Sequence, residues 1–294
     1  MIGRLLASLT LGLAAGLLLS QLPVKAAELP TVEAFGKTPE CAALRTKYPA
    51  LTGKKLTIGL GGYTVGFEAP SAADPTVIEG LDPDLINYMS ACLGFTYEFQ
   101  NGSFNVLLTS ITSGRADMGP SLYVTDVRRK QVAFISNFAV IDGSVVRKGE
   151  AHKMTSLDSL CGATVAAAAG TYEAVNLVPP QSEKCKAAGK PEVNLLLVQN
   201  TDNSVQAVQS GRADIYLTAL SDANALAKSA SGLENAFSID LPILNGFPIA
   251  KENTLMRGAV LDAMKAIQAQ GIEKVLLAKW GQGAESERPA EDKE

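Results

Sequence analysis

The sequence predicts an α/β protein with two similar lobes, and three observations support this fold class. Apolar segments typical of strands alternate with amphipathic segments typical of helices, as at residues 56–60 and 82–93. The pentapeptide Ser-Gly-Arg-Ala-Asp occurs at residues 113–117 and again at 210–214, each time between an amphipathic and an apolar segment. The length of 294 residues suits two domains. A ligand cleft is then expected between the lobes, where the strands after the two copies end.

Composition is typical of a globular protein that does not bind nucleic acid. Hydrophobic residues make up 47% of the chain and charged residues 19%. The net charge of −4 lacks the positive signature of a nucleic-acid-binding protein. The single histidine, His152, belongs to no sequence cluster of cysteines and histidines, so neither a metal site nor a cofactor is expected.

Residues 1–26 have the pattern of a secretory leader. Arg4 supplies the positive charge, residues 5–19 are apolar, and Val-Lys-Ala at 24–26 offers a small-residue cleavage site. The alternative is a membrane anchor, but the short apolar core favours cleavage. No cysteine closely follows the apolar segment, so a freely soluble periplasmic protein is expected.

The four cysteines indicate disulfide bonds, because an exported protein matures in an oxidising compartment. Three pairings are possible. Cys161 and Cys185 flank one segment and form the local pair, which leaves Cys41 to pair with Cys92 and attach the N-terminal extension to the first lobe. The alternative is that the cysteines are free buried thiols. No Cys-x-x-Cys spacing occurs, so no redox-active pair is expected.

The first lobe is expected to open with a strand at residues 56–60 and a loop at 61–67 that contains three glycines. In an open α/β sheet such a loop lines the ligand crevice. Tyr63 or Phe67 of this loop therefore either forms a wall of the ligand site or packs on its own strand. The next helix is expected to begin with Asp82 as N-cap, because a proline follows at the first helical position.

The segment that follows carries the chemistry of the expected site. It reads Ser-Leu-Tyr-Val-Thr-Asp-Val-Arg at residues 121–128 and Gln-Val-Ala-Phe at 131–134. This pattern resembles the solute-binding proteins of ABC importers for polar amino acids, bacterial extracellular solute-binding protein family 3. In that family a small-residue loop and an arginine at this spacing hold the carboxylate of the ligand. An arginine suits this role because its planar fork of donors grips a carboxylate with two hydrogen bonds.

The resemblance spans roughly residues 56–281 and implies a type II periplasmic-binding-protein fold. In this fold two α/β lobes, joined by a two-strand hinge, close around the ligand. We expect this division of the chain: a leader at 1–26, an N-terminal extension at 27–54, the first lobe at 55–142 and 243–282, the second lobe at 143–242, and a disordered charged tail at 283–294.

The resemblance also assigns the following positions to the ligand site: Phe104, Ser121, Tyr123, Arg128, Gly170, Thr171 and Tyr172. Arg128 matches the carboxylate arginine, and Phe104 matches a wall position. Gly170 and Thr171 match a loop that offers backbone N–H groups to an anion at a helix N-terminus. A tight turn with Thr171 as N-cap is expected there whether or not a ligand binds. Tyr123 and Tyr172 stand where small hydroxyl residues are usual, which suggests a reshaped pocket.

One position departs from the family pattern. Related proteins usually have an aspartate, which binds the α-ammonium group of the ligand, five residues after the equivalent of Asp214, whereas this chain has Ala219. Asp222 would substitute only if the start of the following helix shifts. Leaving a buried ammonium group unpaired is costly. The expected ligand is therefore an amino acid, an amino-acid derivative or an amine-free carboxylate.

The resemblance implies a non-enzymatic, monomeric periplasmic receptor that delivers a small carboxylate-bearing ligand to an ABC-type membrane permease. One alternative is a ligand-sensing partner of a membrane receptor, which uses the same closure. The other is a dehydratase on the same fold, since Glu173 lies near where such enzymes place an acidic group. No Gly-x-Ser-x-Gly nucleophile motif occurs in the chain.

Overall fold

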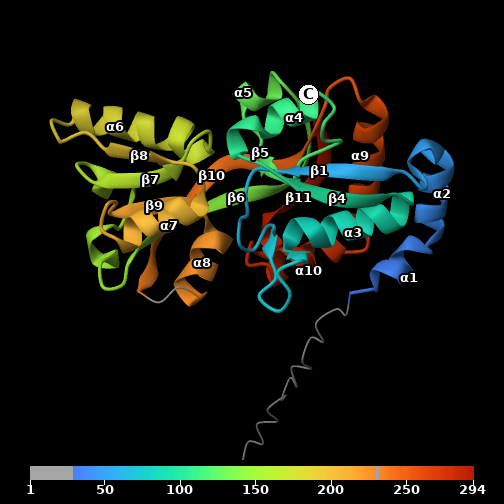
Figure 1. Ribbon diagram of the computed structural model, residues 1–294, viewed down its shortest axis with the longest axis horizontal. Coiled ribbons are helices and arrows are strands. Elements are labelled where there is room, and N and C mark those ends of the chain that lie inside the picture. The colour runs from blue at the N-terminus through green and yellow to red at the C-terminus, as the bar shows by residue number, and fades with distance from the viewer. Residues whose placement is uncertain (1–28, 230–231) are drawn as a thin grey trace, which may run out of the picture.

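The computed structural model describes residues 29–229 and 232–294, which form two α/β lobes side by side (Figure 1). The expected leader at residues 1–26 lies outside this part of the chain. None of the helices in the described ranges is long and apolar enough to cross a membrane.

The first lobe is built from two separate parts of the chain. Its elements are α1 (Val32–Gly36), α2 (Pro39–Lys47), β1 (Lys55–Leu60), β2 (Ala69–Pro70), β3 (Ile78–Glu79), α3 (Leu81–Leu93), β4 (Thr96–Asn101), α4 (Leu107–Thr112), β5 (Leu122–Tyr123), α5 (Asp126–Arg129), α9 (Thr254–Ala269), α10 (Ile272–Lys279) and β11 (Glu287–Lys293). The second lobe contains β7 (Thr164–Ala168), α6 (Val178–Ala187), β8 (Asn194–Val198), α7 (Thr201–Gln209), β9 (Ile215–Ala219) and α8 (Leu220–Ser229).

Two long antiparallel strands, β6 (Ala133–Arg147) and β10 (Leu233–Ile249), run through both lobes (Figure 1). They form the expected two-strand hinge. In the second lobe the strands follow the order β6, β9, β7, β8. The pair of β6 with β9 is antiparallel, and the pairs of β7 with β9 and with β8 are parallel. In the first lobe β1 and β4 form a parallel pair, and the single bridging residue Met118 links β1 to β10. The strand expected after the first Ser-Gly-Arg-Ala-Asp copy is therefore reduced to one bridging residue.

The two Ser-Gly-Arg-Ala-Asp segments make the same contacts in the two lobes. In the first copy, the backbone of Asp117 donates to the carbonyl of Thr57, and its carboxylate accepts from the N–H of Thr57, both at 2.8 Å. In the second copy, Asp214 makes both bonds with Thr164, again at 2.8 Å. The glycine of each copy has a positive φ, 74° and 75°, which only glycine adopts without strain. The sequence repeat is therefore a structural repeat.

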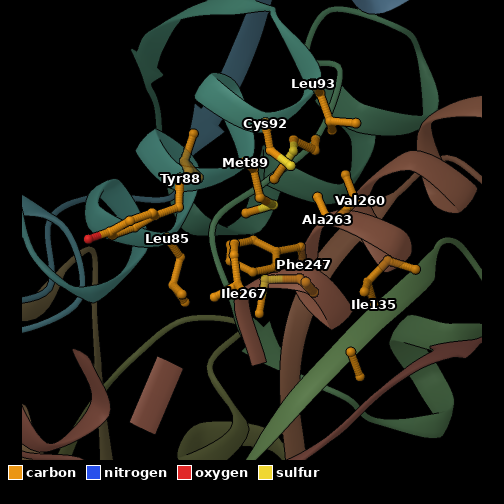
Figure 2. Close-up of a cluster of buried hydrophobic side chains, with 14 of the residues drawn as sticks. Leu85, Tyr88, Met89, Cys92, Leu93, Ile135, Phe247, Val260, Ala263 and Ile267 are labelled. Carbon is orange, nitrogen blue, oxygen red and sulfur yellow. The ribbon is translucent and has the colours of Figure 1, made fainter. Parts of the chain in front are cut away.

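The core of the first lobe lies between α3, α9 and the hinge strand β10 (Figure 2). Leu85 and Met89 are one helical turn apart on α3, and Val260 and Ile267 lie on the same stripe of α9. These side chains and Phe247 of β10 are fully buried in one cluster. The hinge strand is thereby anchored in the first lobe.

Both expected disulfide bonds are present. Cys41–Cys92 joins α2 of the N-terminal extension to α3, with Cα atoms 4.5 Å apart. The side chain of Arg45 strengthens the same junction, because its guanidinium donates to the carbonyls of residues 36, 91 and 92. Cys161–Cys185 joins the segment before β7 to α6 in the second lobe.

Two expectations about element ends are wrong. The tail expected to be disordered forms β11, which pairs with the part of β6 that lies in the first lobe. It occupies the same edge of β6 that β9 occupies in the second lobe. Arg257 of α9 makes ion pairs of 2.9 Å with both Asp292 and Glu294 of this tail. Helix α3 begins at Leu81 with Gly80 as N-cap, so Asp82 is not the cap. Its carboxylate instead accepts hydrogen bonds from Ser121, as described below.

Candidate functional site

The lobes enclose a cleft of about 890 Å³, including its open mouth. The first lobe lines the cleft from within residues 61–68 after β1 and from residues 120–123. The second lobe lines it from within residues 168–173 after β7 and from residues 216–219 of β9. The cleft thus lies at the carboxyl ends of β1, β7 and β9, where open α/β sheets bind ligands.

Eight of the nine residues assigned to the ligand site from the sequence line this cleft. They are Tyr63, Phe67, Phe104, Ser121, Tyr123, Arg128, Thr171 and Tyr172. Gly170 is not a lining residue. Phe67 lines the cleft but is only 4% exposed, and its ring stacks on Phe138 of the hinge strand β6, not of its own strand β1, with ring centroids 6.3 Å apart.

Arg128 occupies a contact between the lobes. Its helix, α5, is capped by the hydroxyl of Thr125, which accepts from the N–H of Arg128. The guanidinium donates to the carbonyl of Tyr123 at 2.9 Å and to that of Gly170 in the second lobe at 3.3 Å, and it lies over the ring of Phe104 at 5.3 Å. Burial lowers the pKa of Arg128, although an arginine stays charged in a protein. The site therefore presents a buried cation bonded to neutral acceptors.

Ser121 has no hydrogen-bond donor left for a ligand in this structure. Its N–H donates to the carboxylate of Asp82 at 3.0 Å and its hydroxyl at 2.5 Å. Burial raises the pKa of Asp82 to about 6. Burial and the adjacent Asp82 raise the pKa of the cleft-lining Glu68 well above its usual range. Burial thus favours the protonated form of both carboxyl groups, and the two hydrogen bonds to Asp82 fix the loop of Ser121.

The second-lobe loop presents an acid to the cleft where anion-binding amides were expected. The N–H of Thr171 donates to the carbonyl of Ala168 at 3.2 Å, so it is not available to a ligand. Glu173 is 6% exposed and lines the cleft, and the adjacent N–H of Glu173 and hydroxyl of Thr171 favour its ionised form. Burial has the larger effect and raises the pKa of Glu173. This loop therefore places a buried acid in the cleft beside the expected anion-binding turn.

The hinge contributes a further buried acid. Asp142 of β6 accepts a hydrogen bond of 2.5 Å at Oδ1 from the hydroxyl of Tyr123. The ring of Tyr123 meets that of Tyr172 edge to face at 5.7 Å. Sequence reasoning missed Asp142 and Glu68. For Asp142 a signal existed, because it is the one charged residue in the apolar run at 138–146.

Asp222 does not replace the missing carboxylate at Ala219. Ala219 lines the cleft, whereas Asp222 does not. The carboxylate of Asp222 accepts from the hydroxyl of Thr218 at 2.9 Å, and burial raises its pKa to about 7. Within the described ranges, no group of three or more His, Cys, Asp or Glu side chains is placed to hold a metal ion.

Comparison with known proteins places this arrangement in a family. The profile of the "Bacterial extracellular solute-binding proteins, family 3" matches residues 56–283. Arginine-binding protein ArgT of Corynebacterium glutamicum is 28% identical over 211 residues, which cover 69% of this chain and 67% of that protein. The probable amino-acid-binding protein YxeM of Bacillus subtilis is 24% identical over 209 residues, 69% of this chain and 76% of that protein.

A solved structure shares the fold. An ancestral arginine-binding protein bound to arginine superposes with a TM-score of 0.69 and 24% identity, covering 78% of this chain and 99% of that chain. The likeness extends over both lobes and the hinge, and it confirms the type II periplasmic-binding-protein fold.

Proposed function

We propose that the cleft captures an amino acid or a close relative by the ligand's carboxylate, because this chain belongs to the bacterial extracellular solute-binding proteins, family 3. The observation that carries the proposal is the buried guanidinium of Arg128. It is the only cationic side chain among the described residues that line the cleft. Its N–H groups donate to two neutral carbonyl oxygens. A ligand carboxylate in their place would accept stronger hydrogen bonds, because it is charged.

The position of Arg128 connects ligand binding to lobe closure. Tyr123 belongs to the first lobe and Gly170 to the second, and the guanidinium reaches both. A carboxylate bound by Arg128 therefore lies at the junction of the lobes, with the aromatic walls of Phe104 and Tyr172 beside it. Closure around the ligand then presents a composite surface of both lobes to a partner.

We further propose that the partner is the permease of an ABC importer and that the protein works as a monomer, without enzymatic activity, in the periplasm. The family and its amino-acid-binding relatives support these assignments. The leader pattern at residues 1–26 supports export.

The test compares Arg128→Gln with Arg129→Gln. Arg129 is the adjacent arginine on α5 and contacts Asp126 rather than the cleft, so it controls for loss of charge on this helix. Each protein is stripped of carried-over ligand by unfolding and refolding, then titrated calorimetrically with the twenty L-amino acids. Loss of a buried, charged hydrogen-bond partner should weaken binding by at least about 30-fold in Arg128→Gln only. Wild-type affinity in Arg128→Gln, or no binding by the wild type, would contradict the proposal.

A further inference from the structure

We propose that a second chamber between the lobes, outside the cleft, binds the far end of an elongated ligand through a neutral hydrogen-bond acceptor such as an amide or ureido carbonyl. This outer chamber has a volume of about 1260 Å³, including its open mouth. It is lined from within residues 61–63 and 101–105 of the first lobe and by residues 169 and 198–202 of the second. The inference rests on the proposed function and extends it, because it assigns a site to the end of the ligand that Arg128 does not hold.

The outer chamber continues the cleft toward the next strand of each lobe. The cleft lies at the carboxyl ends of β1 and β7, and the outer chamber lies at those of their neighbours β4 and β8 (Figure 1). The two spaces share six lining residues, three from each lobe: Gly61, Gly62, Tyr63, Gln199, Asn200 and Thr201. A single elongated ligand therefore has room to occupy both.

Two glycines lie on the passage between the two spaces. The ring centre of Phe104 is 5.3 Å from the guanidinium of Arg128. A Cβ at Gly61 would lie 2.8 Å from this ring, so only glycine lets the ring approach so closely there. A Cβ at Gly62 would have no atom within 4 Å. A ligand whose carboxylate is held by Arg128 therefore has an open course along Phe104 and past the glycines into the outer chamber.

The outer chamber offers side-chain hydrogen-bond donors from both lobes. The side-chain oxygen of Asn101 accepts from the N–H of Gly62 at 3.2 Å, and that of Asn200 accepts from the N–H of Asn203 at 3.0 Å. Because a backbone N–H only donates, these bonds fix the orientation of both amides. Within residues 29–229 and 232–294 neither NH2 group has a hydrogen-bond partner, and both side chains are exposed to the chamber.

These donors select a neutral acceptor over a charged group. The first turn of α7 adds the N–H groups of Thr201 and Asp202, which have no acceptor inside the helix. A guanidinium or ammonium group offers these donors no acceptor and would face the positive end of the helix. A carboxylate would face Asp202, the one charged residue among the described residues that line the chamber. An amide or ureido carbonyl accepts from the donors without either conflict.

The experiment compares side chains of equal length that end in an acceptor or in a cation. The probes are L-citrulline with L-arginine and L-homocitrulline with L-homoarginine, used in calorimetric titrations of protein stripped by refolding. A ureido carbonyl accepts hydrogen bonds, whereas a guanidinium only donates them.

Two variants remove one donor each without removing a bond inside the chain. Asn101→Asp and Asn200→Asp keep an oxygen for the backbone N–H that each side chain now binds, but replace the NH2 group by a second oxygen. Aspartate is also a good N-cap, so Asn200→Asp should preserve α7. Asn203→Asp is the control, because it adds the same charge to the first turn of α7 at a residue that does not line the chamber.

We expect the wild type to bind at least one ureido probe at least about ten-fold more tightly than its guanidino partner, which leaves the NH2 donors unpaired. Asn101→Asp and Asn200→Asp should each lose most of that preference, and Asn203→Asp should keep it. The inference is overturned if the wild type shows no such preference, if either chamber variant keeps it, or if Asn203→Asp loses it equally. Failure of all four probes, while other amino acids bind in a manner that requires Arg128, overturns the inference and leaves the proposed function standing. Absence of binding by any amino acid overturns both.

Discussion

Replacing Glu273 by glutamine should change how the stability of this protein depends on pH. Glu273 lies in the first turn of α10 and is fully buried. Its carboxyl oxygens accept from the side-chain amides of Asn137 at 2.5 Å and Gln268 at 2.6 Å. No cation is among the groups that shift its pKa, and burial raises this pKa from 4.5 to about 8. The folded protein therefore holds a proton here that the unfolded chain has lost at neutral pH.

The sign and size follow from this difference in proton binding. Below pH 4.5 both states are protonated, so Glu273 causes no pH dependence there. Between 4.5 and about 8 the folded state binds the extra proton, so the free energy of unfolding falls as pH rises, by at most about 1.4 kcal/mol per pH unit. Glutamine is uncharged and has no such loss, and its NH2 group is satisfied when the amide of Asn137 turns its Oδ1, which has no partner among the described residues, toward it. Glu273→Gln should be near neutral at about pH 5 and about 2–4 kcal/mol more stable than the wild type at about pH 9.

Urea denaturation of the wild type and Glu273→Gln at several pH values in this range measures the difference directly. Glu183→Gln, at an exposed position on α6, is the matched control and should show no such trend. A difference between Glu273→Gln and the wild type that stays constant with pH would refute the reasoning. It would show that the carboxyl group titrates in the folded protein as it does in the unfolded chain.

Two further predictions concern the hinge and the tail. Gly246→Ala places a Cβ 2.5 Å from the carbonyl oxygen of Ile135 and 2.6 Å from the Cα of Ser136. It should lower the free energy of unfolding, measured by urea denaturation, by about 1–3 kcal/mol or more. An unchanged midpoint would show that the two hinge strands move apart without cost. Deleting residues 287–294 removes β11 and both acidic partners of the largely buried Arg257, so it should cost about 1–3 kcal/mol, and unchanged stability would mean that the tail is only loosely attached.

Short-range rules predicted those features that neighbouring residues decide. The repeated pentapeptide marks the same turn after a helix in both lobes, because its glycine takes the left-handed conformation wherever the segment occurs. The local pair Cys161–Cys185 is a further case.

Expectations failed where a distant segment decides the structure. The tail at 283–294 looked disordered because its composition is polar, but the free side of β6 supplies backbone partners for β11. Asp82 is a residue type that often caps helices, yet its carboxylate accepts hydrogen bonds from the N–H and hydroxyl of Ser121 instead.

The sequence by itself determined the α/β class and the two-lobed plan, because periodicity, turn residues and the repeated pentapeptide are local properties. The hinge and the place of Arg128 in the cleft were implied by the resemblance to the family. Only the tertiary structure decided which acids surround that cleft. Asp142 lies beside two cleft-lining residues because β6 pairs it with Ala219 and the fold brings Tyr123 to its side. Its burial, its free oxygen and its raised pKa arise from these long-range neighbours, and no pattern along the chain encodes them.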